Sequence, residues 1–338
     1  MKRLFALLLI FGLLLGGCAS RPAIPKQYTA TFLTLFDTVT TIVGPGETEE
    51  AFQVKAQQIH DDLLYYHQLF DIYQEYEGVN NLKTVNDQAG VAPVTVDRAI
   101  IELLQDCKNY YEITDGKVNV AMGSVLSLWH DARTEGLRDP RTAKLPDRDK
   151  LAVAAVHTDI DDVIIDAEAS TVYLSDPALR LDVGAVAKGW ATQRVAEQAP
   201  SGLLISVGGN VCATGPKNGE SPWVIGIQNP DGEGNLHTLY LERGTVVTSG
   251  DYQRTYWVEG KQYHHIIDPD TQMPSDYWRS VSVICDDSGL ADALSTALFL
   301  LPLGEGQALA AGCGVEVLWV DADKQEYSTS GLEALIRT

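Results

Sequence analysis

The densest group of reactive side chains in this sequence lies in residues 250–269. Its first part, Gly-Asp-Tyr-Gln-Arg, brings together a carboxylate, an aromatic ring and a guanidinium, and its second part contains the adjacent pair His264 and His265. An imidazole can accept or donate a proton near neutral pH, and a buried imidazole needs a partner at each ring nitrogen. We therefore expect one of these two histidines to be catalytic.

The histidines are expected on the second strand of a β-hairpin. Residues 255–258 and 262–267 are rich in β-forming side chains and are joined by a turn at Glu259-Gly260. Pro269 would end the second strand. Because successive side chains of a strand point to opposite faces, only one of the two histidines can point into a given site.

A second motif begins at Leu181 and reads Leu-Asp-Val-Gly-Ala-Val-Ala-Lys-Gly-Trp. It links a predicted strand to a predicted helix, and its small residues would let a ligand approach the backbone. The helix N-terminus favours an anion, and Asp182 and Lys188 supply one charge of each sign. The alternative interpretation is a tight turn with a surface ion pair.

Asp292 and Thr296 are four residues apart on another predicted helix. This spacing places a carboxylate and a hydroxyl on one face of the helix. Such hard oxygen ligands suit Mg²⁺, which keeps positions open for phosphate oxygens. The alternative is an aspartate that interacts with the helix dipole and a threonine that bonds back to its own helix.

Helices and strands are intermixed along the chain, which favours an α+β fold with mixed or antiparallel sheets and packed helices. Helices are expected at residues 47–73, 97–111, 120–129, 186–198 and 288–301. Strands are expected at residues 29–43, 203–207, 223–228, 236–241, 245–248 and 315–320, with two more in 162–181. We expect an irregular segment at 79–86 and a charged surface loop at 131–150.

The composition limits the class of function. The chain has 338 residues, 45% of them hydrophobic, and a formal net charge of −21. This charge argues against a sequence-independent nucleic-acid binder, which needs a basic face. Residues 206–210 form a Gly-Gly turn without Rossmann spacing, and the sequence has neither a Walker A motif nor a G-x-S-x-G elbow. An anionic nucleotide would therefore need local cations, backbone N–H groups or a metal.

The N-terminus is typical of a bacterial lipoprotein. Two basic residues precede an apolar run at 4–15 that is too short to cross a bilayer, and a Leu-Gly-Gly-Cys lipobox ends at Cys18. A lipid on Cys18 would anchor the protein to the outer side of the cell membrane. The predicted organisation is a signal peptide at 1–17, a lipidated tether at 18–30 and one domain, with up to two intertwined subdomains, at 31–338.

Four further cysteines are far apart and lack C-x-x-C spacing, so a cysteine metal site is poorly supported. Their even number would allow disulfides outside the cytoplasm, but sequence cannot pair them. We expect buried free thiols at Cys107, Cys212, Cys285 and Cys313.

Together these motifs resemble the ApbE family of FAD:protein FMN transferases, many of which are bacterial lipoproteins. Phe36-Asp37-Thr38 resembles the family's Met-Gly-Thr motif with two substitutions, and Lys117-Val118-Asn119 occupies the place of a Phe-Asp pair. Asn119 cannot carry the charge of that carboxylate. The strongest similarity lies in residues 182–189, 249–254, 264–269 and 291–300.

The resemblance implies an ApbE (T-fold-like) architecture and transfer of the FMN part of FAD to a threonine hydroxyl of an acceptor protein, with release of AMP. It implies Mg²⁺ held by Asp292, Thr296 and the carbonyl of Ala185. His265 is the candidate base, with His264 as the competing assignment, and Asp292 is the second catalytic residue. The implied FAD site comprises Phe36, Tyr73, Lys117, Val118, Asn119, Asp182, Lys188 and Ile266.

Two other functions are compatible with these residues. One is a Mg²⁺-dependent FAD pyrophosphatase, in which water replaces the acceptor hydroxyl. The other is a lipoprotein that captures flavin for a transporter without chemistry. Asp292, Thr296 and the histidine pair argue against simple capture, which needs no metal. The expected partners are thus FAD, an acceptor protein and the membrane, with no nucleic acid.

Overall fold

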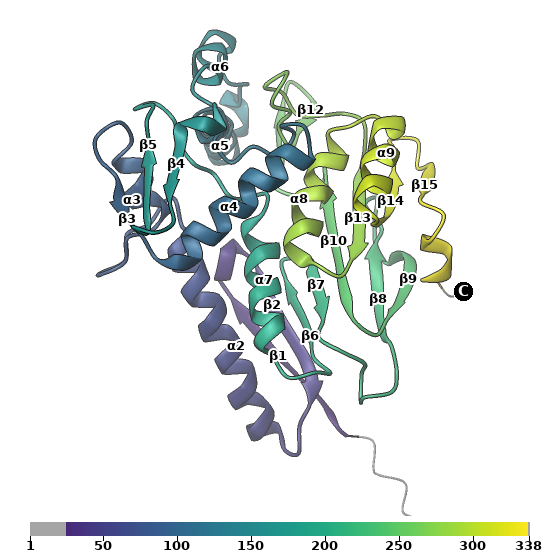
Figure 1. The fold of residues 1–338 in the computed structure, drawn as a ribbon. Coiled ribbons are helices and arrows are strands. Elements are labelled where there is room, and N and C mark those ends of the chain that lie inside the picture. Colours follow the sequence, from purple (N-terminus) through teal and green to yellow (C-terminus); the bar gives the residue numbers. More distant parts are fainter. Residues whose placement is uncertain (1–24, 337–338) are drawn as a thin grey trace, which may run out of the picture.

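The computed structural model describes residues 25–336 and has an α+β architecture around one eight-stranded sheet (Figure 1). All neighbouring strands of this sheet are antiparallel, which confirms the predicted fold class. In order across the sheet, the strands are β1 (Gln27–Leu33), β2 (Val39–Pro45), β6 (Leu204–Val207), β7 (Asn210–Ala213), β10 (Gly244–Gly250), β13 (Ser280–Cys285), β14 (Glu316–Val320) and β15 (Glu326–Ser328).

The predicted signal peptide and Cys18 lie outside the described residues. The predicted tether lies partly outside them, and its last residues, from Gln27 onward, belong to β1. Within residues 25–336, no helix combines the length and the apolar character that crossing a membrane requires.

Helices cover one face of the large sheet and a two-stranded ribbon covers the other (Figure 1). The strand period of two explains this division, because Val247 packs against α8 while its neighbour Val246 packs against the ribbon. The helices are α2 (Glu49–Phe70), α7 (Ala187–Gln198), α8 (Ser288–Phe299) and α9 (Leu303–Cys313), and the ribbon is β8 (Trp223–Gln228) with β9 (Asn235–Leu241).

Two smaller layers extend this body beside the cavity described below. The first surrounds α3 (Leu82–Asp87), α4 (Arg98–Ile113) and a sheet of β3 (Val94–Thr95), β5 (Thr171–Leu174) and β4 (Val163–Asp166). The second packs α5 (Gly123–Arg138) and α6 (Arg148–Ala155) near the hairpin of β11 (Tyr256–Val258) and β12 (Lys261–Tyr263). Trp129 of α5 and Tyr256 of the hairpin share the core of this second layer.

The segment predicted as one strand at 29–43 is a hairpin, so that prediction was wrong. β1 and β2 pair from Gln27 opposite Pro45 to Leu33 opposite Val39. Between them Thr34, Phe36 and Asp37 have φ angles of 85°, 51° and 54°. These left-handed conformations reverse the chain without glycine or proline, so the usual sequence signals of a turn are missing.

Two segments predicted without helices contain them. Residues 79–86 include most of α3, where the Asn81 side chain caps the helix by accepting a hydrogen bond from the Thr84 N–H. Residues 131–150 hold the second half of α5, a 3-10 turn at Pro140–Thr142 and the start of α6. Most side chains of this stretch are exposed, so its apolar periodicity is weak.

The other predicted helices are present, including α4, where the Asp97 carboxylate caps the N-terminus as expected. The strands predicted in the second half of the chain are also present, whereas β3, β7, β13, α9 and β15 were not predicted. The four described cysteines are free thiols, as expected. Cys107 and Cys212 are buried, whereas Cys285 and Cys313 are only partly buried, so the expectation of burial was wrong for these two.

The predicted hairpin forms, but its second strand ends at Tyr263, before either histidine. His264 and His265 follow in irregular backbone, and both line the same cavity. The expectation that strand alternation sends them to opposite faces was therefore wrong. Side chains alternate regularly between faces only within a strand. Because β12 ends before His264, alternation does not apply to the two histidines.

Candidate functional site

One cavity of about 670 Å³ brings the predicted site residues together. Its walls come from the β1–β2 turn, the segment after α2, the α4–α5 loop, the start of α7, α8 and the segment after β12. Cys18 is outside the described residues. The predicted residues that line the cavity are Phe36, Tyr73, Lys117, Val118, Asn119, Asp182, Ala185, Lys188, His264, His265, Ile266, Asp292 and Thr296.

The crossing of α7 and α8 fixes Asp292. The Gly189 N–H donates to Asp292 Oδ2 at 2.8 Å, and Lys188 Nζ lies 3.6 Å from the same oxygen. A Cβ at position 189 would lie 2.2 Å from the Ser288 carbonyl oxygen, so only glycine allows the helices to approach this closely. The buried carboxylate is thus held by the Gly189 N–H and faced by the Lys188 ammonium.

The donor atoms near this crossing suit a hard cation. Only Oδ2 of Asp292 is engaged by protein groups in the described part of the chain. The Gly189 N–H bonds to Asp292 and the Trp190 N–H to Val186, which leaves the carbonyl of Ala185 without a helical donor. With the hydroxyl of Thr296, the cavity offers a carboxylate, a carbonyl and a hydroxyl, all oxygen ligands of the type that Mg²⁺ prefers.

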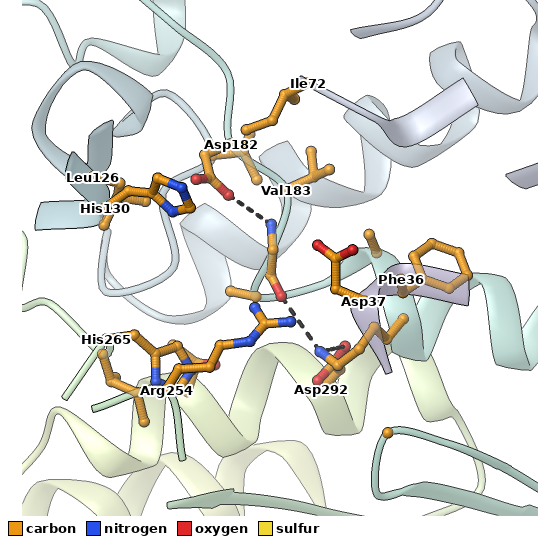
Figure 2. Close-up of a pocket in the computed structure, with 18 of the residues that line it drawn as sticks. Phe36, Asp37, Ile72, Leu126, His130, Asp182, Val183, Arg254, His265 and Asp292 are labelled. Atoms are coloured by element: carbon orange, nitrogen blue, oxygen red, sulfur yellow. Dashed lines mark hydrogen bonds and ion pairs between the residues drawn. The ribbon is translucent and has the colours of Figure 1, made fainter. Parts of the chain in front are cut away.

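Asp182 occupies the turn that leads into α7. Its Oδ1 accepts a hydrogen bond from the Gly184 N–H at 2.8 Å (Figure 2). Burial raises the pKa of Asp182, while this bond and the charges of His130 and Arg254 act in the opposite direction. The Gly184 carbonyl in turn accepts from Lys188 Nζ at 3.4 Å, so the turn is braced at both ends.

The two histidines differ in their partners. His264 Nε2 donates to the Ser275 carbonyl at 2.6 Å, and its Nδ1 accepts from the Ile266 N–H at 3.2 Å. Both nitrogens of His264 are therefore used by the backbone. His265 Nδ1 is buried and has no hydrogen-bond partner within residues 25–336.

The surroundings also keep His265 neutral. Burial lowers the pKa of His265 to about 3, and the charges of Arg254, Lys188 and Arg133 contribute to this shift. A neutral ring with an unpartnered nitrogen can accept a proton, whereas His264 would first have to break a backbone bond. The geometry favours His265 over His264 as the base.

Aromatic side chains form another wall. Tyr73 stacks on His130 with ring centroids 5.3 Å apart and planes at 29°. Burial and the charge of Asp182 raise the pKa of Tyr73 to about 12. The burial of Tyr73 is only partial, because 53% of the residue is exposed, and this leaves apolar ring surface for a planar ligand.

The α4–α5 loop is tied to the segment after β12. Lys117 Nζ lies 3.1 Å from Asp268 Oδ1 and 2.7 Å from Asp270 Oδ2. Burial opposes the charge of Lys117, but these two hydrogen bonds outweigh it and raise its pKa. Asn119 donates to the Thr158 carbonyl and accepts from the Ala121 N–H, so its side chain already braces the loop.

Several cavity residues were not predicted as site residues. Among the polar ones are His130, Arg133, Asn210 and Arg254. Asn210 follows a Gly208-Gly209 turn in which both glycines have positive φ, and its buried Nδ2 has no partner in the described chain. The Gly-Gly-Asn sequence is the one signal that could have drawn attention to it.

Comparison with known proteins identifies the family. The model of the ApbE family matches residues 36–319, most of the chain. The chain belongs to the ApbE family. A Treponema pallidum protein named FAD:protein FMN transferase is 33% identical over 310 residues, which cover 83% of each chain. A Klebsiella pneumoniae protein of the same name is 34% identical over 252 residues, covering 71% of this chain and 76% of that protein.

Solved ApbE structures have the same fold. The crystal structure of the Thermotoga maritima ApbE protein aligns with a TM-score of 0.83 at 28% identity, covering 93% of this chain and 100% of the other. The flavin transferase ApbE from Vibrio cholerae gives a TM-score of 0.77 at 23% identity over 92% of this chain and 99% of the other. The predicted recognition, architecture and transferase class are therefore confirmed.

Proposed function

We propose that this protein transfers the FMN part of FAD to a threonine hydroxyl of an acceptor protein and releases AMP. The observation that carries the proposal is a single cavity that joins the oxygen donors Asp292 and Thr296 to the unpartnered nitrogen of His265. Its volume of about 670 Å³ suits a ligand of nucleotide size. The names of the curated relatives support FAD as the substrate.

We further propose Mg²⁺ as the cofactor, held by Asp292, Thr296 and the Ala185 carbonyl. When bound there, Mg²⁺ would neutralise the diphosphate of FAD and stabilise the negative charge on the departing AMP. Lys188 would bind the same anionic group from the α7 side, since its ammonium lies near Asp292. An acidic protein would thereby hold an anionic substrate through local positive charge.

His265 would act as the general base. The acceptor oxygen attacks the FMN phosphorus in line, the new P–O bond forms as the P–O bond to AMP breaks, and AMP leaves with the bridging oxygen. The hydroxyl proton passes to His265, which makes the hydroxyl a competent nucleophile. The negative charge of bound FAD would raise the pKa of His265 from about 3 towards the working range.

The test uses the purified protein with FAD, Mg²⁺ and an acceptor protein that carries a threonine site, with EDTA in matched samples. AMP, FMN and FAD are resolved by chromatography, and acceptor-bound flavin is detected by in-gel fluorescence. The proposal predicts AMP and labelled acceptor in equal amounts, both lost with EDTA. AMP with equal free FMN and no label would instead assign the pyrophosphatase activity. Unchanged FAD in every sample would leave only flavin capture.

We also propose that the protein is a lipoprotein on the outer side of the cell membrane. The proposal is supported by the lipobox that ends at Cys18. Metabolic labelling with a palmitate analogue should mark the wild-type protein and fail to mark Cys18→Ser. A labelled Cys18→Ser protein would contradict it.

A further inference from the structure

Two arginines at the cavity lack an acidic partner. Arg133 of α5 and Arg254, which follows β10, both line the cavity, and neither forms an ion pair in the described part of the chain. The protein carries 46 acidic and only 25 basic residues, so acidic partners are plentiful. The charge of Arg254 acts on Asp182, but neither guanidinium forms an ion pair with a carboxylate of the described residues. Both guanidinium groups can therefore bind an anion that comes from outside the chain.

Arg133 contacts the loop that carries Arg254. Its Nη1 donates to the Arg254 carbonyl at 3.4 Å, and its Nη2 lies 3.2 Å from His130 Nδ1. Burial and the charge of Arg254 lower the pKa of Arg133. The fold thus holds two like charges close together, an arrangement that a bound anion would stabilise.

Arg254 is directed towards the reacting groups. In Figure 2 its side chain extends from the His265 side of the cavity towards Asp292. Arg254 and His265 line the same cavity, and after burial the charge of Arg254 is the largest contributor to the lowered pKa of His265. Its backbone has a φ of 47°, an uncommon conformation that sets the direction of the side chain.

We propose that Arg254, supported by Arg133, binds the phosphate of the FMN moiety, the group that the protein transfers. This inference rests on the proposed function. It adds a ligand for the FMN phosphate, which the residues predicted for the metal and for FAD do not include. A guanidinium can donate two parallel N–H bonds to phosphate oxygens, and such bonds strengthen as charge develops. Arg254 is then a catalytic residue, and Arg133 is a positioning residue that holds the Arg254 loop.

The test measures binding rather than turnover. The full chain in detergent is titrated with FMN, riboflavin and AMP without Mg²⁺, and flavin fluorescence or calorimetry reports affinity. Arg254→Gln should weaken FMN binding about 10- to 100-fold, the usual effect of losing a charged hydrogen bond. Riboflavin and AMP should bind as they do to the wild type. The matched control is Arg98→Gln, which removes the same charge from the exposed face of α4 and should bind FMN normally.

Arg133 is tested by a double-mutant cycle. Arg133→Gln should weaken FMN binding less than Arg254→Gln, and the double variant should lose less than the product of the two single effects. Independent, fully multiplicative losses would contradict the positioning role. Arg254→Lys should retain part of the FMN affinity, which distinguishes a lost charge from a misfolded loop.

Other outcomes would overturn the assignment. Equal losses of FMN and riboflavin affinity would mean that Arg254 contacts the flavin ring or only supports the fold. A loss for AMP alone would place the anion on the other side of FAD. Because FMN binding needs no acceptor, a failed transfer assay with normal Arg254-dependent FMN binding would reject the proposed function and keep this inference.

Discussion

At the level of single residues, His264 and His265 are adjacent in the chain, yet the fold gives them different tasks. His264 has a backbone partner at each ring nitrogen, while His265 keeps a buried nitrogen without one. Sequence could identify the pair but not choose between them by geometry, because the partner at Ser275 comes from a turn that sequence does not resolve. Position in a hydrogen-bond network, rather than residue type, favours His265 as the proposed base.

The low pKa of His265 predicts a pH effect on stability. Burial lowers it from 6.5 to about 3, so between these values the unfolded chain binds a proton that the folded chain does not. The free energy of unfolding should therefore fall as pH drops through this window, by at most about 1.4 kcal/mol per pH unit from this group. Urea unfolding of ligand-free protein at several pH values should show a shallower slope for His265→Gln.

The control for that measurement is Val54→Ala, which changes an exposed, uncharged side chain of α2. The pH slope of this variant should equal that of the wild type. A His265→Gln slope equal to that of the wild type would show that His265 is already protonated in the folded protein, and would argue against its role as base.

Asn210 and Asn86 form a second contrast at the residue scale. The Asn86 side chain both donates to and accepts from the backbone of Leu181, whereas Asn210 Nδ2 has no partner in the described chain. Asn86→Ala should lower the free energy of unfolding by about 2 kcal/mol or more. Asn210→Ala should leave stability nearly unchanged and weaken FAD binding about 5- to 30-fold, since its donor awaits a ligand.

Thermal unfolding without ligand and FAD titration measure these two effects. An Asn210→Ala variant that unfolds easily but binds FAD normally would assign Asn210 a structural role. The sequence around Asn210 showed no helical or strand periodicity that singled this residue out. Asp292 and Thr296, by contrast, are four residues apart on one predicted helix, a spacing that is visible in the sequence.

At the level of elements, the site depends on how closely α7 and α8 cross. Gly189 provides the N–H that holds Asp292, and an added Cβ would lie 2.4 Å from the Asp292 Cβ. Gly189→Ala should therefore destabilise the protein by about 1–3 kcal/mol and reduce FAD turnover, because the helices must separate. Chemical denaturation and an AMP-release assay check the two effects.

Gly304→Ala is the matched control, since it lies in α9 with no atom within 4 Å of an added Cβ. It should be neutral or slightly stabilising, as alanine favours helix. A Gly189→Ala variant with unchanged stability and turnover would show that the crossing is not tight and that Asp292 is held otherwise.

Some of the elements could be predicted from sequence patterns, and others could not. Helices such as α4 and α8 were predictable because apolar periodicity and a capping aspartate coincide within a few positions. The β1–β2 turn was not, because its left-handed residues Thr34, Phe36 and Asp37 carry no glycine. The early end of β12 likewise depends on tertiary packing, which periodicity does not encode.

At the level of the whole molecule, the cavity forms where segments distant in sequence meet. The ion pair of Lys117 with Asp268 joins the α4–α5 loop to the segment after β12, across 151 positions of the chain. Family resemblance could name the residues of each wall, but their convergence on one cavity required the fold. The chain as a whole has a net charge of −21, but the cavity contains several positively charged side chains. These local positive charges suit an anionic substrate.

The central claim is tested most directly by the intact mass of an acceptor protein after incubation with FAD and Mg²⁺. Transfer predicts a mass increase of one FMN less one water, located on a threonine by fragmentation. Asp292→Asn should abolish this mass increase. The control is Asp286→Asn, which changes an exposed aspartate just before α8 and should preserve the increase. An acceptor of unchanged mass beside complete conversion of FAD to FMN and AMP would contradict the account.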